Sequence, residues 1–344
     1  MNHPTSIQNV AELDEVLSRP SSAVVEAVKN LTGHIMLLGA GGKMGPSLAE
    51  LAKRAVEAGK INKKIFAVSR FSNQAERRRL ESIGVETISC NLLNADELQR
   101  LPETENVIYM AGMKFGATDK AAETWATNAY LPGMVAQKFR NSRFVLFSTG
   151  NVYPLIPVKL GGCTEDDAIN PLGEYAQSAL GRERIFEYFS RALQIPGVII
   201  RLNYAIDLRY GILLEVAQKV FHRQSIDLTM GHVNVIWQGE ANSIVWRAFA
   251  MAQTPPAILN VTGLETVAIR ELAKKFGEIF QIEPVFANTE AGSALLSNAS
   301  RCSQLFGPPA ITLPQMIEWV SHWVKISGPT LAKPTHYETR DGKF

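Results

Sequence analysis

The sequence predicts an α/β fold in which a doubly wound parallel sheet is followed by a smaller C-terminal lobe. Three observations lead to this prediction. Short apolar runs alternate with stretches of helical spacing from residue 34 to residue 202, and this alternation is typical of βαβ units in a parallel sheet. A glycine-rich turn follows the first apolar run directly. Beyond about residue 203, helical stretches are separated by turns that contain proline and glycine.

The individual elements are predicted in order along the chain. Residues 9–32 should form two short helices, with Pro20 near the start of the second and Gly33 at its end. Strands are expected at 34–40, 64–69, 85–90, 106–110, 143–148 and 197–202, with one further strand at 258–261. Helices are expected at 44–58, 75–82, 119–139, 172–193, 211–223, 239–252, 268–280 and 313–326.

Composition argues against several classes of protein. The chain has 344 residues, of which 46% are apolar and 20% charged, as in ordinary soluble proteins. The formal net charge of +2 gives no general attraction to nucleic acid or anionic membranes, and no run approaches the ~20 apolar residues that span a bilayer. The cysteines and histidines lack the spacing of disulfide frameworks or metal sites, so no metal is expected. Because acidic residues precede any apolar run at the N-terminus, we expect a cytoplasmic protein.

The turn after the first strand has the composition of a phosphate-binding loop. Gly39, Gly42 and Gly45 are spaced G-x-x-G-x-x-G between a predicted strand and a predicted helix. In such a loop one glycine allows the tight turn, one lets the backbone approach a pyrophosphate, and one lets the helix pack on the strand. The N-terminus of the helix then offers N–H groups and partial positive charge to phosphates. The sequence therefore predicts a Rossmann-type fold that binds a nicotinamide dinucleotide.

The end of the second strand indicates which dinucleotide is bound. An acidic residue there would bind the ribose 2′-hydroxyl of NAD, but this chain has Ser69 and Arg70. The planar guanidinium of an arginine suits a 2′-phosphate, and Lys43 in the loop could add to its charge. NADP is therefore favoured over NAD, although Arg70 could instead stack on adenine or point to solvent.

These elements divide the chain into three parts. Residues 1–32 form an N-terminal helical extension. The dinucleotide-binding domain spans 33–205, and the chain rejoins it at about 230–255. Residues 206–229 and 256–344 form the substrate-binding lobe and the tail.

Several short motifs resemble those of one family when they are taken in order. They are Asn91-Leu92, Met110-Ala111-Gly112, the segment FSTGNVY at 147–153, Thr164-Glu165-Asp166 followed by Pro171 and Tyr175, and Arg201-Leu202-Asn203. Together with the glycine loop they resemble the extended short-chain dehydrogenase/reductase superfamily, in particular the NAD-dependent epimerase/dehydratase family. The likeness covers residues 34–326, although Leu38 stands where a threonine is usual.

The resemblance implies roles for individual residues. Tyr175 would exchange a proton with a substrate hydroxyl while hydride moves to or from the nicotinamide, and Thr149 would hold the same oxygen. The implied cofactor-binding residues are Gly39, Gly42, Lys43, Met44, Gly45, Ser69, Arg70, Asn91, Leu92, Ala111, Gly112, Tyr175 and Asn203. Asp207, Arg209 and Tyr210 follow the loop that meets the nicotinamide, where contacts to the substrate are expected.

The chain departs from the family at one catalytic position. The family has Y-x-x-x-K, whereas Ala179 stands four residues after Tyr175. Keeping a tyrosine ionised at pH 7 without help costs about 4 kcal/mol, since a free tyrosine titrates near ~10. Three alternatives remain. Arg182 could reach back to the tyrosine, the positive nicotinamide ring could replace the lysine, or Tyr175 could stay neutral while a base in 153–170 or near Gln238 and Glu240 takes the proton.

The predicted function is that of an NAD(P)-dependent oxidoreductase or epimerase. Its substrate would carry a reactive hydroxyl on a sugar, sugar acid or nucleotide sugar, as the resemblance implies. The alternative is a dinucleotide-binding regulatory protein with impaired catalysis, which the alanine at position 179 permits. The resemblance also implies a homodimer that pairs the helices at 119–139 and 172–193.

Overall fold

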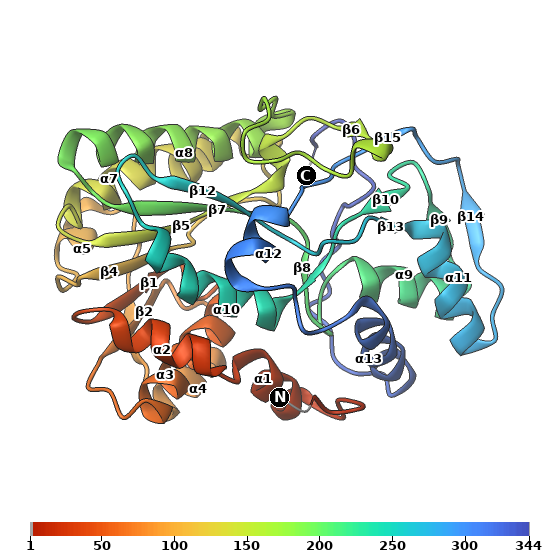
Figure 1. Cartoon of the computed structure of the whole chain (residues 1–344), viewed down its shortest axis with the longest axis horizontal. Helices are drawn as coiled ribbons and strands as arrows, with labels where there is room; N and C mark the ends of the chain where they lie inside the picture. The colour runs from red at the N-terminus through yellow and green to blue at the C-terminus, as the bar shows by residue number, and fades with distance from the viewer. Residues whose placement is uncertain (1–2, 344) are drawn as a thin grey trace.

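The computed structural model describes residues 3–343 and contains a seven-stranded parallel sheet (Figure 1). The strand order is β12-β7-β5-β4-β1-β2-β3, which extends the order of the doubly wound Rossmann fold by one strand. The predicted fold class is therefore confirmed. The strands are β1 (Ile35–Leu38), β2 (Ile65–Ser69), β3 (Glu86–Ser89), β4 (Asn106–Tyr109), β5 (Arg143–Thr149), β7 (Gly197–Leu202) and β12 (Ala257–Val261).

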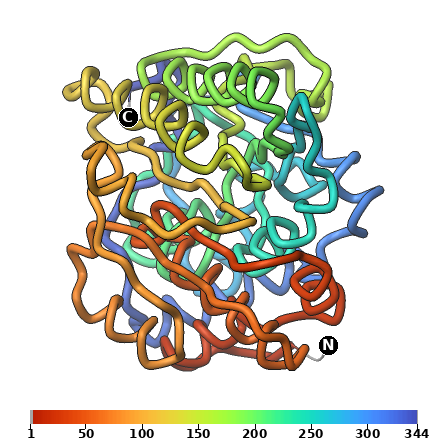
Figure 2. Tube along the Cα trace, turned by 90° about the vertical axis from the view of Figure 1, so that its left-hand side faces the viewer, coloured from red at the N-terminus to blue at the C-terminus, as the bar shows by residue number. Residues whose placement is uncertain are grey.

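Helices cover both faces of this sheet. On one face lie α2 (Ser22–Asn30), α3 (Gly45–Ala58) and α10 (Gln238–Ala248), and on the other α5 (Ala95–Gln99), α7 (Leu131–Lys138) and α8 (Gly173–Leu193) (Figures 1 and 2). Side chains of one strand alternate between the two cores, with Ile35 and Leu37 in one and Met36 and Leu38 in the other. This double burial explains why the strands are continuous apolar runs in the sequence.

One helical segment differs from the prediction, and the two predicted N-terminal helices are confirmed. The stretch expected as one helix at 119–139 consists of α6 (Ala121–Trp125), a π-helical turn η1 (Ala126–Tyr130) and α7. Pro132 stands in the first turn of α7, where its missing N–H is tolerated. At the N-terminus, α1 (Val10–Ser18) and α2 are capped by Asn9 and Ser21 and pack beside α3 and α10. The elements α4 (Gln74–Ser82) and β3 complete the sheet edge.

The second lobe has its own apolar core. It is built from α9 (Ile212–Phe221), α11 (Ile269–Phe280) and α13 (Leu313–Lys325). The remaining short strands pair in twos: β8 (Ala205–Ile206) with β11 (Ile236–Trp237), β9 (Ser225–Asp227) with β14 (Val285–Ala287), β10 (His232–Val233) with β13 (Val267–Ala268), and β6 (Ile156–Pro157) with β15 (Ser293–Ala294). No helix within residues 3–343 has the length and apolar character needed to cross a bilayer.

One predicted boundary needs correction. The strand near 258–261 was expected, but residues from 256 onward were assigned to the substrate lobe. In the structure β12 pairs in parallel with β7, with Ala257 opposite Val198, and is the last strand of the main sheet. The helix α12 (Ser300–Phe306) packs against it. After α13 the chain continues without helix or strand, and Figure 1 shows this tail in dark blue between the two parts of the molecule. Residues 1, 2 and 344 of the predicted end segments lie outside the described residues.

The contact between the glycine loop and its helix gives a testable prediction. A Cβ at Gly45 would collide with the carbonyl of Ala40, whereas a Cβ at Gly42 would meet only the carbonyl oxygen of Gly39, at 3.5 Å. We therefore expect Gly45→Ala to reduce the free energy of unfolding by about 2 kcal/mol or more, because backbone must move to admit the methyl group. Gly42→Ala is the matched control and should unfold like the wild type in thermal and urea melts. Equal melting curves for both variants would contradict this account of the packing.

Candidate active site

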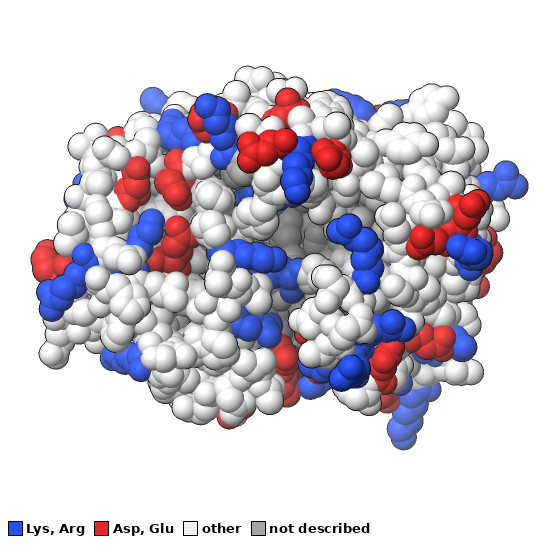
Figure 3. Space-filling model, turned by 180° about the vertical axis from the view of Figure 1, so that it is seen from behind, with Lys and Arg blue, Asp and Glu red and all other residues white. Residues whose placement is uncertain are grey.

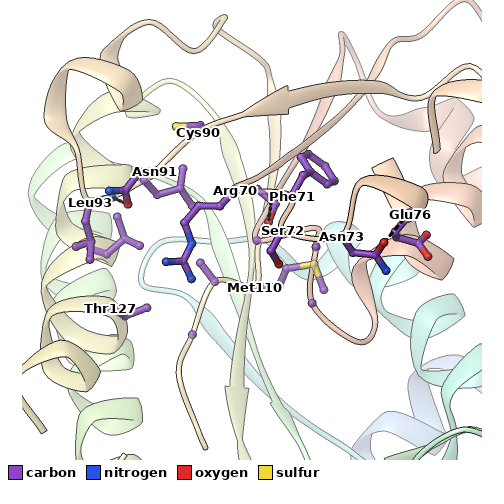
Figure 4. Close-up of a pocket in the computed structure, with 18 residues that line it drawn as sticks. Arg70, Phe71, Ser72, Asn73, Glu76, Cys90, Asn91, Leu93, Met110 and Thr127 are labelled. Carbon is purple, nitrogen blue, oxygen red and sulfur yellow. Dashed lines mark hydrogen bonds between the residues drawn. The ribbon is translucent and has the colours of Figure 1, made fainter. Parts of the chain in front are cut away.

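A cavity of about 320 Å³ lies at the carboxyl ends of β1, β2 and β4 (Figure 4). Ligands of doubly wound sheets bind at this edge, where the strand order reverses. Of the predicted cofactor residues, the cavity wall contains Gly39, Gly42, Ser69, Arg70, Asn91, Leu92, Ala111 and Gly112. The structure thus brings together residues from four separate segments of the sequence.

The glycine loop has the form of a phosphate cradle. Gly39 has a φ of +92°, and a Cβ there would lie 2.6 Å from the amide nitrogen of Ala111, so the turn is seated against the loop after β4. Gly42 is different, because the protein's own packing leaves space for a side chain at that position. No side chain caps the N-terminus of α3, so its first N–H groups remain to bind another partner. These features suit the binding of a pyrophosphate. Close approach of a pyrophosphate to the backbone would also explain why residue 42 is a glycine, although the packing of the protein does not require one there.

Arg70 lies at the opposite end of the cavity from the glycine loop. Figure 4 shows its guanidinium extending into the cavity between Leu93 and Met110. Within residues 3–343 no carboxylate forms a salt bridge with it. Two of the three arginines on α4 are engaged elsewhere, since Arg77 pairs with Glu81 and Arg79 with Glu50, and the third, Arg78, is exposed and does not line the cavity. Arg70 is therefore the arginine of this region that a bound dinucleotide can meet.

Lys43 does not act where the sequence placed it. Its Nζ donates to the carbonyl oxygen of Ala205 at 2.6 Å and lies 4.4 Å from the centre of the Tyr210 ring. The expectation that Lys43 strengthens the charge near Arg70 is wrong, because the side chain points across to the second lobe. Burial lowers the pKa of Lys43 to about 8, against the opposing effect of the Asp207 carboxylate.

The other loop residues and Asn203 have distinct surroundings. Met44 packs into the apolar core, and Gly45 packs on Ala40. Asn203 is buried, and its Nδ2 has no hydrogen-bond partner among the described residues. Its side chain lies against Gly150, directly after Thr149. A buried amide donor without a partner beside this position fits a polar ligand, because leaving it unpaired costs roughly 1–3 kcal/mol.

Tyr175 and Thr149 lie on elements that the sequence anticipated. Tyr175 is in the first turn of α8 and is half-buried. Thr149 is buried at the end of β5, and its Oγ1 accepts from the backbone N of Asn151 at 3.2 Å and from its Nδ2 at 3.0 Å. Ala179 is fully buried in a small cluster with Val152, Tyr153 and Cys163.

Sequence reasoning missed Lys114, which lies beside Tyr175. Its Nζ is 5.9 Å from the centre of the Tyr175 ring and donates to the carbonyl oxygen of Thr335 at 3.3 Å. Burial lowers its pKa to about 8; Glu338 and Glu215 oppose this shift, and Lys43 adds to it. A signal was available in the sequence, because Lys114 follows the Met110-Ala111-Gly112 motif by two residues.

Asn128 is a second residue that sequence reasoning missed. Its Oδ1 accepts from the backbone N of Met113, and its Nδ2 donates to the carbonyl of Met113 and to Ser178 Oγ, at 2.8 to 2.9 Å. Arg182 donates to Asn128 Oδ1 at 2.7 Å and to the carbonyl of Phe147 at 2.8 Å. Arg182 is buried in this role, so it supports the loop that precedes Lys114, and its guanidinium is not directed at Tyr175.

The other proposed bases and substrate residues are engaged elsewhere. Gln238 donates to Ser47, and Glu240 accepts from the backbone of Ala310. Arg209 forms ion pairs with Asp14 of α1 and with Asp207. Tyr210 lies under the Lys43 ammonium, and burial raises its pKa to about 12. Tyr210 is therefore the one of the three expected substrate residues that lies beside the catalytic candidates.

On the face seen in Figure 3, Lys and Arg side chains border a hollow near the middle of the molecule. Such a border favours an anionic ligand such as a dinucleotide. Within residues 3–343 no group of three or more His, Cys, Asp or Glu side chains is arranged to hold a metal. The thiols of Cys90, Cys163 and Cys302 are buried and unpaired.

Solved structures with the same fold support the assignment of the sheet and lobe. UDP-glucose 4-epimerase from Thermotoga maritima, in complex with UDP-glucose, has a TM-score of 0.69 and 14% identity, over 86% of this chain and 99% of its own. UDP-glucuronic acid 4-epimerase from Bacillus cereus, in complex with NAD, has a TM-score of 0.69 and 16% identity, over 85% and 98%. dTDP-glucose 4,6-dehydratase from Bacillus anthracis, in complex with NAD, has a TM-score of 0.70 and 15% identity, over 86% and 97%.

These identities show a shared fold and leave the specific activity open. No curated protein sequence is similar enough to match this one. The model of the NAD dependent epimerase/dehydratase family matches residues 35–206, from β1 to β8. That segment contains the glycine loop, Lys114, Thr149 and Tyr175. Since it makes up half of the sequence, the chain belongs to the NAD-dependent epimerase/dehydratase family.

Proposed function

We propose that this chain uses NAD to oxidise and reduce a hydroxyl-bearing carbon of a sugar, sugar acid or nucleotide sugar, as an oxidoreductase or epimerase. The observation that carries the proposal is the pair formed by Tyr175 and Lys114, whose ring centre and Nζ lie 5.9 Å apart, in a chain whose glycine loop lines a cavity at the sheet edge. The family is NAD dependent, and structural neighbours were solved with NAD and with UDP-sugars. When bound, NAD supplies the hydride acceptor and donor.

Thr149 and Tyr175 handle the proton and the substrate oxygen in this proposal. Thr149 Oγ1 already accepts two hydrogen bonds from Asn151, which uses both acceptor positions of a hydroxyl. Its own hydrogen is then directed to the substrate oxygen. Tyr175 takes the proton from that oxygen as a general base and returns it as a general acid.

Lys114 supplies the positive charge that the family takes from the helix lysine. Ala179 stands at that lysine's place in the motif and packs in an apolar cluster. The Nζ of Lys114 lies 5.9 Å from the centre of the Tyr175 ring, so the ammonium would stabilise negative charge that develops on the tyrosine oxygen during proton transfer. In this proposal the positive charge lies on the loop after β4, whereas in the family it lies on the helix that carries the tyrosine.

Substitution of this pair tests the proposed reaction. Tyr175→Phe should lower kcat by about 10²- to 10⁴-fold and leave the Kd for NAD within a few-fold. Turnover is followed by nicotinamide absorbance and by proton NMR of the sugar. Tyr188→Phe, an exposed tyrosine on the same helix, is the matched control. A regulatory protein without catalysis would bind NAD and show no turnover in the wild type, and unchanged turnover in Tyr175→Phe would refute the assigned role.

The same pair predicts a pH dependence. Lys114 is charged below its pKa of about 8, so wild-type turnover should fall as the pH rises through the pKa of this group. The phosphates of bound NAD favour the charged ammonium, so in the NAD-loaded enzyme this fall should occur at pH 8 or at a higher pH. Lys114→Arg keeps its positive charge at high pH, so its turnover should not fall in this pH range. Lys114→Met should lower kcat across the whole range. If turnover of Lys114→Arg fell with rising pH as in the wild type, a group other than Lys114 would be responsible for the pH dependence.

The choice between NAD and NADP depends on Arg70. The sequence favoured NADP, but the comparisons name NAD and give no support to that preference. We propose NAD as the physiological cofactor, with Arg70 able to meet a 2′-phosphate because its guanidinium extends into the cavity. A charge-assisted contact to phosphate is worth roughly 1.5–3 kcal/mol.

Calorimetric titration of Arg70→Ala checks this arrangement. The wild type should bind NAD at least as tightly as NADP. The variant should lose roughly 10- to 100-fold in affinity for NADP, with little change for NAD. Arg78→Ala, an exposed arginine on α4, serves as the control. Equal losses of affinity for NAD and NADP would indicate that Arg70 contacts the adenine, which both cofactors share, and not the 2′-phosphate.

We also propose a homodimer built on α6, η1 and α8. Tyr130 and Tyr188 are both 65% exposed, and Trp125 and Ile185 are exposed nearby on the same elements. Helices α7 and α8 pack side by side, so a second copy would extend this layer into a four-helix bundle. Exposed apolar patches of this kind mark protein interfaces.

Sedimentation velocity tests the dimer. The wild type should sediment as a dimer at micromolar concentration, and Tyr188→Glu should sediment as a monomer, because a charge would be buried in the interface. Leu160→Glu, which changes an equally exposed apolar residue elsewhere, should remain dimeric. A monomeric wild type would refute the proposal.

A further inference from the structure

The C-terminal tail crosses the cleft between the sheet domain and the second lobe. On the lobe side, the backbone N of Leu331 donates to the carbonyl of Arg209 at 2.9 Å. The N and Oγ1 of Thr335 donate to Glu215 at 3.1 and 2.7 Å. Arg340 donates to the carbonyl and the hydroxyl of Ser293, each at 2.7 Å. The tail is thus fixed at three points along one wall of the cleft.

The same segment also contacts the catalytic side of the cleft. Lys114 donates to the carbonyl of Thr335, and the rings of Phe115 and His336 lie 6.2 Å apart. Gly342 is packed against the backbone of Leu172 and Gly173 so closely that a Cβ at Gly342 would collide with the carbonyl of Leu172. Gly173 stands two residues before Tyr175, so the tail ends beside the turn that carries the proposed base.

Two cavities lie along the tail. One cavity of about 250 Å³ is bounded by Tyr210, Glu215 and tail residues 330–335. Another of about 240 Å³ is bounded by Asn151, Leu172 and tail residues 339–342. Drug-sized ligands fill roughly 300–1,000 Å³, so each cavity suits a smaller molecule. A nucleotide sugar would need the two to be continuous.

The tail also contributes polar groups that lack partners. Tyr337 Oη and Glu338 Oε2 are buried without a hydrogen bond among the described residues. Native proteins rarely leave such groups unpaired, because each costs roughly 1–3 kcal/mol. A phenol and a carboxylate match the donors and acceptors of sugar hydroxyls.

We propose that tail residues 331–342 form part of the substrate site and restrict it to a monosaccharide-sized polyol without a nucleotide. This inference rests on the proposed function and narrows its substrate class. The solved neighbours cover up to 99% of their own length but only 85–86% of this chain, so this chain has segments beyond the shared fold.

Binding of UDP-glucose by the NAD-loaded protein tests the role of the tail. Calorimetry on the full chain should detect no binding at millimolar UDP-glucose. Two variants release the tail: a chain ending at Thr330, and the double substitution Arg340→Ala with Gly342→Val, which keeps the buried Tyr337. Either variant that melts within a few degrees of the full chain should bind UDP-glucose at least 10-fold more tightly. Lys343→Ala, at an exposed tail position, should behave like the full chain.

A second arm tests the substrate class directly. The full chain with NAD should turn over members of a panel of free hexoses, their uronic acids and polyols, and none of the matching UDP-sugars. Micromolar binding of UDP-glucose to the full chain would overturn the proposal, as would folded tail variants that still exclude it. Failure of the proposed function is seen separately, as absent NAD binding or as unchanged turnover in Tyr175→Phe.

Discussion

The geometry of the site depends on one buried amide. Asn128 uses its carbonyl oxygen and both amide hydrogens to tie the backbone of Met113 to Ser178 on α8 and to Arg182. Because all of these bonds are made in a buried setting, the loop after β4 has one position relative to α8. That position places Ala111 against the glycine turn and Lys114 beside Tyr175. The cofactor cradle and the proton-transfer pair are therefore positioned by the same few hydrogen bonds.

The sequence predicts those parts of the molecule that short local patterns determine. The order of apolar runs predicts the parallel sheet, because strands buried on both faces have no alternation. The glycine loop is equally predictable from the sequence, since Gly39 has a positive φ and Gly45 packs directly on Ala40. Each of these requirements involves residues that are close in the sequence. The placement of β12 needed the structure, because its pairing with β7 joins residues about sixty apart.

The rest of the site depends on contacts between distant residues. Lys43 was assigned to the phosphate end because it lies in the loop, but its length lets the amine reach the carbonyl of Ala205 on β8. Lys114 gains its role from Tyr175 and from Thr335, more than two hundred residues further along. Helical spacing made Arg182 one of three alternatives for the group that assists Tyr175, yet buried acceptors at Phe147 and Asn128 decide its direction. Spacing along one helix cannot reveal such competing partners.

The tail and the loop lysine are linked through their charges. Lys43 and Lys114 repel each other, and burial disfavours the charged form of both. The carboxylates of Glu215 and Glu338 oppose this effect at Lys114, and Glu338 belongs to the tail. Seating of the tail therefore favours the ammonium form beside Tyr175, and that form favours the seated tail by the reciprocity of linked equilibria. A lysine fixed on the helix at position 179 would carry its charge whether or not the tail were in place. A lysine on the loop makes the charge depend on the seating of the tail, so that in the proposed reaction the pair of Tyr175 and Lys114 would be completed by the tail.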